Sequence, residues 1–177
     1  NTLDVDPDAY AGLYTGETEV VSYSYIVTDS NGGTVSQTAT ITIAGVDDVP
    51  TVSAALSSTV TENDGTYSLD LLAGAEDTDA NDTLNVSGLT LLSGNAAGIT
   101  VNGNTLDIDP GVYNSLAEGE SEVVSYSYSV TDANGNTVVQ TATISIAGVN
   151  DTPTVGAALS STVTEEAGAY SLNLLSD

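Results

Sequence analysis

Short stretches in which apolar and polar residues alternate recur along most of this chain. The clearest lies at residues 124–130, where Val124, Tyr126, Tyr128 and Val130 are separated by serines. Alternation with a period of two places one set of side chains on the buried face of a strand and the other set in water. The pattern therefore predicts a half-buried strand with both tyrosines in the core.

Seven such strands are predicted between residues 48 and 150. Their expected positions are 51–60 with an interruption near residues 54–55, 67–71, 84–93, 99–101, 105–109, 124–130 and 139–146. Residues 73–83 are polar enough to predict a loop, and residues 110–116 have the spacing of one helical turn after a proline that ends the preceding strand. Many short strands without a helix of any length predict an all-β fold, a seven-stranded antiparallel Greek-key sandwich of the immunoglobulin or cadherin type.

The strand pattern repeats with a period of 103 residues. When residues 1–74 are aligned with residues 104–177, 52 of the 74 pairs are identical. The stretch AGVDDVPTV at 44–52, for example, returns as AGVNDTPTV at 147–155. Self-similarity at a fixed period is typical of a tandem array, in which this acidic stretch is the joint between units.

The period divides the chain into one whole unit and two partial ones. We expect residues 1–47 to be the C-terminal part of one repeat, residues 48–150 a complete repeat, and residues 151–177 the N-terminal part of the next. A unit of about 100 residues is large enough to fold around its own core. Because residues 75–103 occur only once, the partial units cannot complete each other, so we expect the sequence to be a window on a longer array.

The charge of the chain narrows the range of functions. It has 25 acidic residues and no lysine, arginine or histidine, which gives a net charge of −25. Without basic side chains it cannot neutralise phosphates, which excludes nucleic acid and makes an anionic membrane surface an unfavourable partner. No apolar run approaches the roughly 20 residues that a membrane span needs. A chain this acidic requires counter-cations, and Ca²⁺ is the natural one because it prefers oxygen ligands.

Enzyme chemistry has little support in the composition. The chain has no cysteine, histidine or lysine to act as a nucleophile or as a base near neutral pH. The same lack of cysteine excludes disulfides. We therefore expect a non-enzymatic protein.

Four segments of the complete unit resemble a known family. They are YSYSVTDANGN at 126–136, TATISIAGVNDTP at 141–153, LAEGE at 116–120 and DTDANDTL at 77–84. These segments are similar to the bacterial cadherin-like repeats known as VCBS repeats, which fill the long middle of large secreted adhesins of the RTX type. The resemblance implies an extracellular extender that holds a distant adhesive tip away from its anchor on the bacterial surface, with a role in adhesion and biofilm formation.

Threading the seven strands up and down predicts which loops meet at each joint. The loop at 73–83 and the turn at Asp132 fall where the chain enters the sandwich, and the turn at Glu62 and the corner after residue 107 fall where it leaves. Linker acids of one unit then meet loop acids of the next, where carboxylates repel one another unless a cation binds them. The predicted calcium ligands are Asp4, Asp6, Asp47, Asp48, Glu62, Asp77, Asp79, Asp107, Asp109, Asp132, Asn150 and Asp151.

The arrangement is similar to the calcium joint of cadherins, with departures. The linker is shorter and reads Asp-Asp at 47–48 but Asn-Asp at 150–151, so the number of ions stays open. Asp132 has an alternative role as the side chain that hydrogen-bonds the backbone of its own turn. The loop from Asp77 also begins like an EF-hand, but Asp82 replaces the required glycine and Gly88 the required glutamate, which excludes that motif.

The expected function is structural. The repeats would be calcium-stiffened extenders of a secreted adhesin or surface filament, whose partners are the neighbouring repeats of the same chain. The alternatives are a module that binds a glycan or a protein, and a subunit of an extracellular fibre in which like chains associate laterally.

Overall fold

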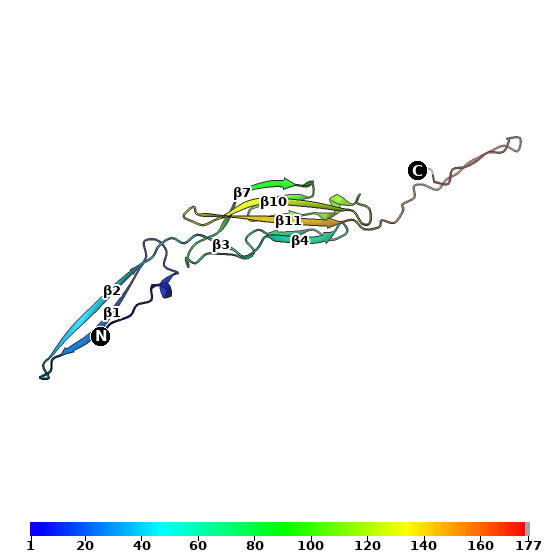
Figure 1. Ribbon diagram of the computed structural model, residues 1–177. Helices are drawn as coiled ribbons and strands as arrows, with labels where there is room; N and C mark the ends of the chain where they lie inside the picture. The colour runs from blue at the N-terminus through cyan, green and yellow to red at the C-terminus, as the bar shows by residue number, and fades with distance from the viewer. Residues whose placement is uncertain (176–177) are drawn as a thin grey trace.

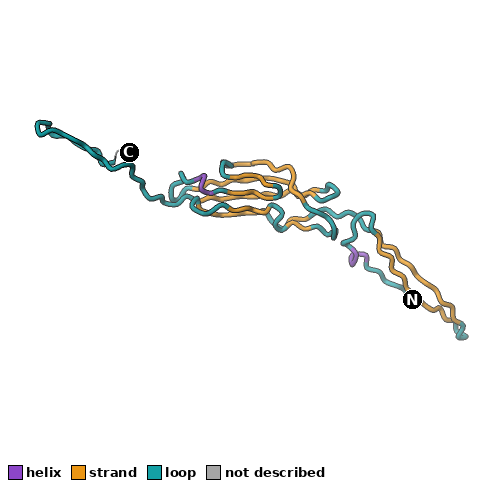
Figure 2. The backbone as a smooth tube through the Cα atoms, turned by 180° about the vertical axis from the view of Figure 1, so that it is seen from behind, coloured by secondary structure: helices purple, strands orange, loops and turns teal. Residues whose placement is uncertain are grey.

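The computed structural model of the chain describes residues 1–175, so the last two residues of the expected third unit lie outside it. Three parts follow one another along an elongated molecule: an N-terminal hairpin, a central sandwich and a C-terminal tail (Figure 1). The central part is built almost entirely from strands, as Figure 2 shows from the opposite side. The joint between the hairpin and the sandwich is therefore well separated from the joint between the sandwich and the tail.

The sandwich contains two main sheets. One has the strand order β4-β11-β10-β7, the other the order β5-β9-β8, and β3 pairs with β6 beside them. The strands are β3 (Thr51–Val52), β4 (Leu56–Thr61), β5 (Tyr67–Asp70), β6 (Ala75–Glu76), β7 (Asn85–Ser93), β8 (Ile99–Asn102), β9 (Thr105–Ile108), β10 (Ser121–Thr131) and β11 (Thr137–Ala147). This confirms the predicted all-β, immunoglobulin-like sandwich. A single 3-10 turn, η2 (Pro110–Tyr113), follows β9 at the place predicted for one helical turn.

The core lies between the two sheets, where the alternating pattern predicted it. On β10, Val124 and Val130 are fully buried and Tyr126 and Tyr128 are 5% and 2% exposed. The serines between them alternate toward the solvent side. The hydroxyl group of Tyr128 donates a hydrogen bond to the carbonyl of Leu71 at 2.8 Å, which satisfies the only polar atom that this side chain buries.

Two details differ from the predicted strands. The first strand is split in two, as expected, but its second half, β4, pairs with β11 in a parallel rather than an antiparallel register. The crossover between the sheets lies near Ala54, whose carbonyl accepts a hydrogen bond of 2.7 Å from the buried side chain of Gln140. The polar loop at 73–83 also contains the short strand β6, which is held by its pairing with β3 rather than by any apolar pattern of its own.

The N-terminal part contains β1 (Thr18–Thr28) and β2 (Thr34–Ala44), paired as one antiparallel hairpin, and the 3-10 turn η1 (Pro7–Tyr10). These strands correspond to β10 and β11, yet Tyr23 and Tyr25 are 49% and 47% exposed here. In the sandwich the equivalent tyrosines face a second sheet, and the described residues contain no such sheet beside β1. Residues 2–6, where the repeat predicts a strand, likewise form none among the described residues.

The C-terminal tail repeats the sequence that forms β3, β4 and β5 in the sandwich, but among the described residues it lacks the strands with which these pair. Residues 151–175 form no strand, although residues 159–164 repeat the sequence of β4. In the sandwich, β4 depends on β11 of its own unit for its hydrogen bonds. A strand is stabilised by its neighbours rather than by local preference, which explains why equal sequences have different structures in the two places.

At the exit end of the sandwich, one buried glutamate ties three segments together. Glu62 follows β4 and has no exposed surface. One of its carboxylate oxygens accepts a hydrogen bond from the backbone N–H of Val149 at 2.8 Å, and the other accepts one from Leu116 at 3.2 Å. Charge-assisted bonds of this kind are stronger than those between neutral groups. Glu62 therefore fixes the corner after η2 and the exit of β11.

We predict that Glu62→Gln destabilises the sandwich. The amide group would turn a donor toward one of the two backbone N–H groups and leave it without an acceptor, at a cost of about 1–3 kcal/mol. In a domain of this size, each kcal/mol lowers the melting temperature by about 4–8 °C, which thermal circular dichroism measures.

The matched control is Glu165→Gln, because Glu165 stands at the same place in the next repeat and is exposed in the tail. It should leave the melting temperature unchanged. Equal effects of the two substitutions would contradict the assigned role of Glu62.

Candidate metal centre

Five aspartates gather where the N-terminal hairpin meets the sandwich. Their carboxylate oxygens form two overlapping groups, in each of which the atoms lie within 4.8 Å of one another. One group is Asp47, Asp79 and Asp82, and the other is Asp77, Asp82 and Asp132. Asp82 belongs to both, so the five side chains make one continuous acidic site.

Three of the five come from the loop between β6 and β7. The backbone N–H of Asp79 donates to the carboxylate of Asp77 at 3.0 Å, and that of Asp82 donates to the carbonyl of Asp79 at 3.1 Å. These bonds fold the loop so that its three aspartates turn to one side. Asp79 is only 3% exposed, although nothing basic lies near it. The loop therefore buries charge instead of presenting it to solvent.

Asp132 comes from the turn between β10 and β11. Its Oδ1 accepts three backbone hydrogen bonds, from Asn134 at 2.9 Å, from Gly135 at 2.6 Å and from Asn136 at 2.8 Å. Gly135 has a φ of +98°, a conformation that favours glycine. The alternative role of Asp132 as the acceptor of its own turn is thus present in the structure. It uses one oxygen and leaves Oδ2 pointing into the acidic site without a donor.

Four buried carboxylate oxygens in the site have no hydrogen-bond donor among residues 1–175. They are Oδ2 of Asp77, Oδ1 of Asp79, Oδ2 of Asp82 and Oδ2 of Asp132. Buried polar atoms are almost always paired in proteins, and buried charges are paired or bind metals. Because the chain has no lysine, arginine or histidine, none of these oxygens can be neutralised by a basic side chain.

The pKa values of two aspartates reflect this environment. Burial raises the pKa of Asp82, and the charges of Asp77, Asp132, Asp47 and Asp79 raise it further. For Asp132, burial also opposes ionisation, but the hydrogen bonds from Asn136, Gly135 and Asn134 outweigh burial and lower the pKa. The site thus combines one carboxylate whose pKa is lowered with another whose pKa is raised.

The linker from the preceding unit docks onto this site. The backbone N–H of Asp48 donates to Oδ2 of Asp79 at 2.8 Å, and the Asp47 carboxylate accepts hydrogen bonds from the side-chain amides of Asn134 and Asn136. The carbonyl of Gly12, in the preceding unit, also accepts a bond of 3.3 Å from the N–H of Ala80. The two units therefore touch through the same loop and turn that hold the acids.

The structure brings together the carboxylates of Asp47, Asp77, Asp79 and Asp132, and Asp48 joins them only through its backbone N–H. It places the other predicted ligands elsewhere. Asp6 caps η1 through a bond of 3.2 Å from the N–H of Asp8, and Asp4 precedes it on the exposed N-terminal segment. Both oxygens of Glu62 are occupied at the opposite end of the sandwich. Asn150 and Asp151 are exposed, and neither belongs to an acidic group among residues 1–175.

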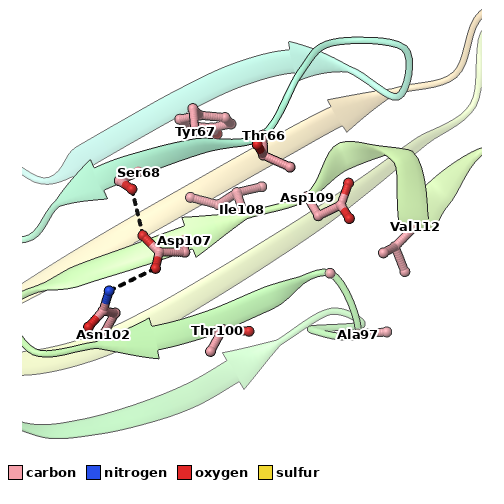
Figure 3. Close-up of a pocket in the computed structure, with 11 residues that line it drawn as sticks. Thr66, Tyr67, Ser68, Ala97, Thr100, Asn102, Asp107, Ile108, Asp109 and Val112 are labelled. Atoms are coloured by element: carbon pink, nitrogen blue, oxygen red, sulfur yellow. Dashed lines mark hydrogen bonds between the residues drawn. The ribbon is translucent and has the colours of Figure 1, made fainter.

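Asp107 and Asp109 line an open groove of about 570 Å³ on the outer side of the β5-β9-β8 sheet (Figure 3). Asp107 lies between two donors, the Ser68 hydroxyl at 2.5 Å and the Asn102 amide at 3.0 Å, and these bonds lower its pKa. Asp109 caps η2 by accepting from the N–H of Gly111 at 3.1 Å. Each of these two carboxylates accepts hydrogen bonds within its own unit, away from the acidic group.

Sequence reasoning left three residues out of the predicted site. Asp82 lies in the predicted loop, but it was considered only as the residue that replaces the glycine of an EF-hand, and not as a ligand. The sequence pattern indicated only that Asn134 and Asn136 belong to a tight turn. A signal was available for Asn136 alone, because positions 33 and 136, like positions 47 and 150, differ between the repeats while most of their surroundings are identical.

Comparison with known proteins identifies the sandwich. Residues 47–145, more than half of the chain, match the family model described as Bacterial Ig domain. Domains of this kind are usually found on the surface of bacteria or outside the cell, and they are typically structural rather than catalytic. No helix within residues 1–175 has the length and apolar character to cross a membrane. No curated protein matches the chain. The strand order and the family match agree, and the chain belongs to the bacterial Ig domain family.

Proposed function

We propose that these units are extender repeats of a large secreted bacterial adhesin or surface filament, of the cadherin-like VCBS type, and that Ca²⁺ stiffens the joint between them. The observation that carries this proposal is the set of four buried carboxylate oxygens without a donor, at the point where two units touch. The neighbouring repeats of the same chain are the partners that such a joint connects.

The geometry of the acidic site suits calcium. Ca²⁺ takes six to eight oxygens at about 2.3–2.6 Å, so two oxygens on opposite sides of one ion lie about 4.8 Å apart. The oxygens in each acidic group lie within 4.8 Å of one another, which allows every member to reach a common ion. Mg²⁺ requires oxygens at about 2.0–2.1 Å in near-octahedral geometry and keeps most of its water. A site made of carboxylates from three separate segments therefore favours the larger ion, which tolerates irregular coordination.

A bound ion would stiffen the joint because the site draws on both sides of it. Asp47 belongs to the linker, while Asp77, Asp79, Asp82 and Asp132 belong to the sandwich. Bending the joint would move the linker carboxylate away from the other four and break its contact with the ion. The same ion would relieve the repulsion among the five carboxylates, so calcium would increase both stiffness and thermal stability.

A binding module for glycans or proteins has weaker support. The groove in Figure 3 is its best candidate site, but it is open and the Asp107 carboxylate in it already has donors within the unit. The one aromatic residue that lines the groove, Tyr67, is half-buried, and its hydroxyl group is hydrogen-bonded to Ser58 at 2.7 Å. The groove therefore lacks the exposed aromatic surface on which sugars commonly stack.

We predict that millimolar Ca²⁺ raises the melting temperature of the protein and extends it in solution, compared with the protein in EDTA. Small-angle X-ray scattering measures the maximum dimension, and scanning calorimetry measures the unfolding temperature. Mg²⁺ at the same concentration is the control for ionic strength and should have a much smaller effect. Identical scattering profiles and melting curves in Ca²⁺ and EDTA would rule out the proposed mechanism.

We also predict that Asp82→Asn weakens calcium binding by about tenfold or more, because Asp82 belongs to both acidic groups. Changes even to residues outside the direct ligands cost about 10–100-fold in metal affinity. Isothermal titration calorimetry measures the affinity and the number of ions.

The control for this substitution is Asp70→Asn, which removes the same charge away from the joint. The next repeat has Asn173 at this place, and its side chain accepts the same type of backbone bond, from Leu175 at 3.0 Å, that Asp70 accepts from Leu72 at 2.9 Å. Asp70→Asn should bind calcium as the unchanged protein does. Loss of affinity in both variants would point to a general charge effect instead of a site.

A further inference from the structure

The turn between β10 and β11 holds the linker through two side-chain amides. Asn134 donates to one oxygen of the Asp47 carboxylate and Asn136 donates to the other. The amides project from a rigid base, because Oδ1 of Asp132 accepts the backbone N–H groups of residues 134–136 at 2.6–2.9 Å. The turn therefore presents two fixed donors to a residue of the neighbouring unit.

The equivalent turn of the first unit keeps the base and changes one of the amides. Oδ1 of Asp29 accepts from the N–H groups of Asn31 at 2.9 Å and of Gly33 at 2.7 Å, and Gly32 has a φ of +87°. The backbone scaffold is thus the same in both units. Asn31 corresponds to Asn134, but Gly33 stands where the sandwich has Asn136.

The other half of the contact also varies between repeats. The linker residue is Asp47 at the first joint and Asn150 at the second, although Gly-Val precedes it and Asp follows it in both linkers. A carboxylate has acceptors on both oxygens, so it satisfies two amide donors at once. An asparagine there would satisfy one donor with its carbonyl and turn its own N–H₂ group toward the other. A turn with glycine at the second position has no such second donor.

We propose that the residues at positions 134 and 136 determine which linker residue docks at a joint. A turn with two asparagines selects an aspartate, and a turn of the Asn31 and Gly33 type accepts an asparagine. The inference rests on the proposed role of the joint as the stiff point of the array, although the contact itself needs no ion. It makes Asn136 the specificity-determining residue, with Asn134 as the donor that both turns share.

A double-mutant cycle tests this selection in the full chain, with Asp47→Asn, Asn136→Gly and the two combined. Hydrogen–deuterium exchange of linker residues 46–49, followed by mass spectrometry in EDTA, reports docking because the N–H of Asp48 is bonded to Asp79 at 2.8 Å. Each single substitution should speed the exchange by about tenfold, since it removes or mismatches a hydrogen bond to a charged group. The combined variant should exchange more slowly than either single variant.

The control is Asn31→Gly, which makes a comparable change in the equivalent turn of the first unit and touches no linker among residues 1–175. It should leave the exchange of residues 46–49 unchanged. If the changes in exchange rate caused by Asp47→Asn and Asn136→Gly simply multiply in the combined variant, the two residues are not energetically coupled and the proposal is wrong.

Calcium titrations of the same proteins separate this proposal from the proposed function. If Asn136→Gly loses a bound ion that Asp47→Asn retains, the loss does not pass through Asp47, Asn136 is itself an ion ligand and its assigned role is overturned. If no variant binds calcium but the cycle still shows coupling, the selection stands and the calcium mechanism fails. If calcium binds normally to the unchanged protein and coupling is absent, the calcium mechanism stands and the selection fails.

Discussion

The structure depends on a single electrostatic constraint, the burial of negative charge in a chain that has no basic side chain to balance it. Most of the acids avoid the problem by lying in solvent or by accepting backbone hydrogen bonds, as Glu62 does with both of its oxygens. The acids at the first joint do so only in part, since four of their buried oxygens have no donor among the described residues. The joint is therefore the place where buried negative charge is left without a partner among residues 1–175.

The fold was largely predictable because each main strand carries its own alternating pattern. The features that escaped prediction depend on pairing rather than on local sequence. The strand β6 lies in a polar segment and exists through its contact with β3, and the parallel register of β4 follows from a crossover that Gln140 supports. The tail also shows this dependence on pairing. Residues 159–164 repeat the sequence of β4 but form no strand, because no described strand pairs with them.

The candidate site was predictable in outline because strand direction determines which loops share an end of a sandwich. That reasoning placed Asp77, Asp79 and Asp132 beside the linker, but it could not decide which acids turn inward. It therefore included Asp107 and Asp109, which bond within their own unit, and omitted Asp82, whose position depends on how the loop folds back on Asp79. Side-chain direction within a loop is a tertiary property that spacing alone does not specify.

The parallel pair of β4 and β11 also determines how the sandwich responds to force. The chain enters the unit just before β3 and leaves it just after β11, and the register joins Leu56–Thr61 to Ala142–Ala147 side by side. A pull on the two ends therefore drags these neighbouring strands past each other in shear. All of their hydrogen bonds are loaded together, instead of opening one by one as in a hairpin that is peeled apart. Glu62 adds its bond to Val149 at the end of the same pair, so the first and last strands act as a mechanical clamp for the whole domain.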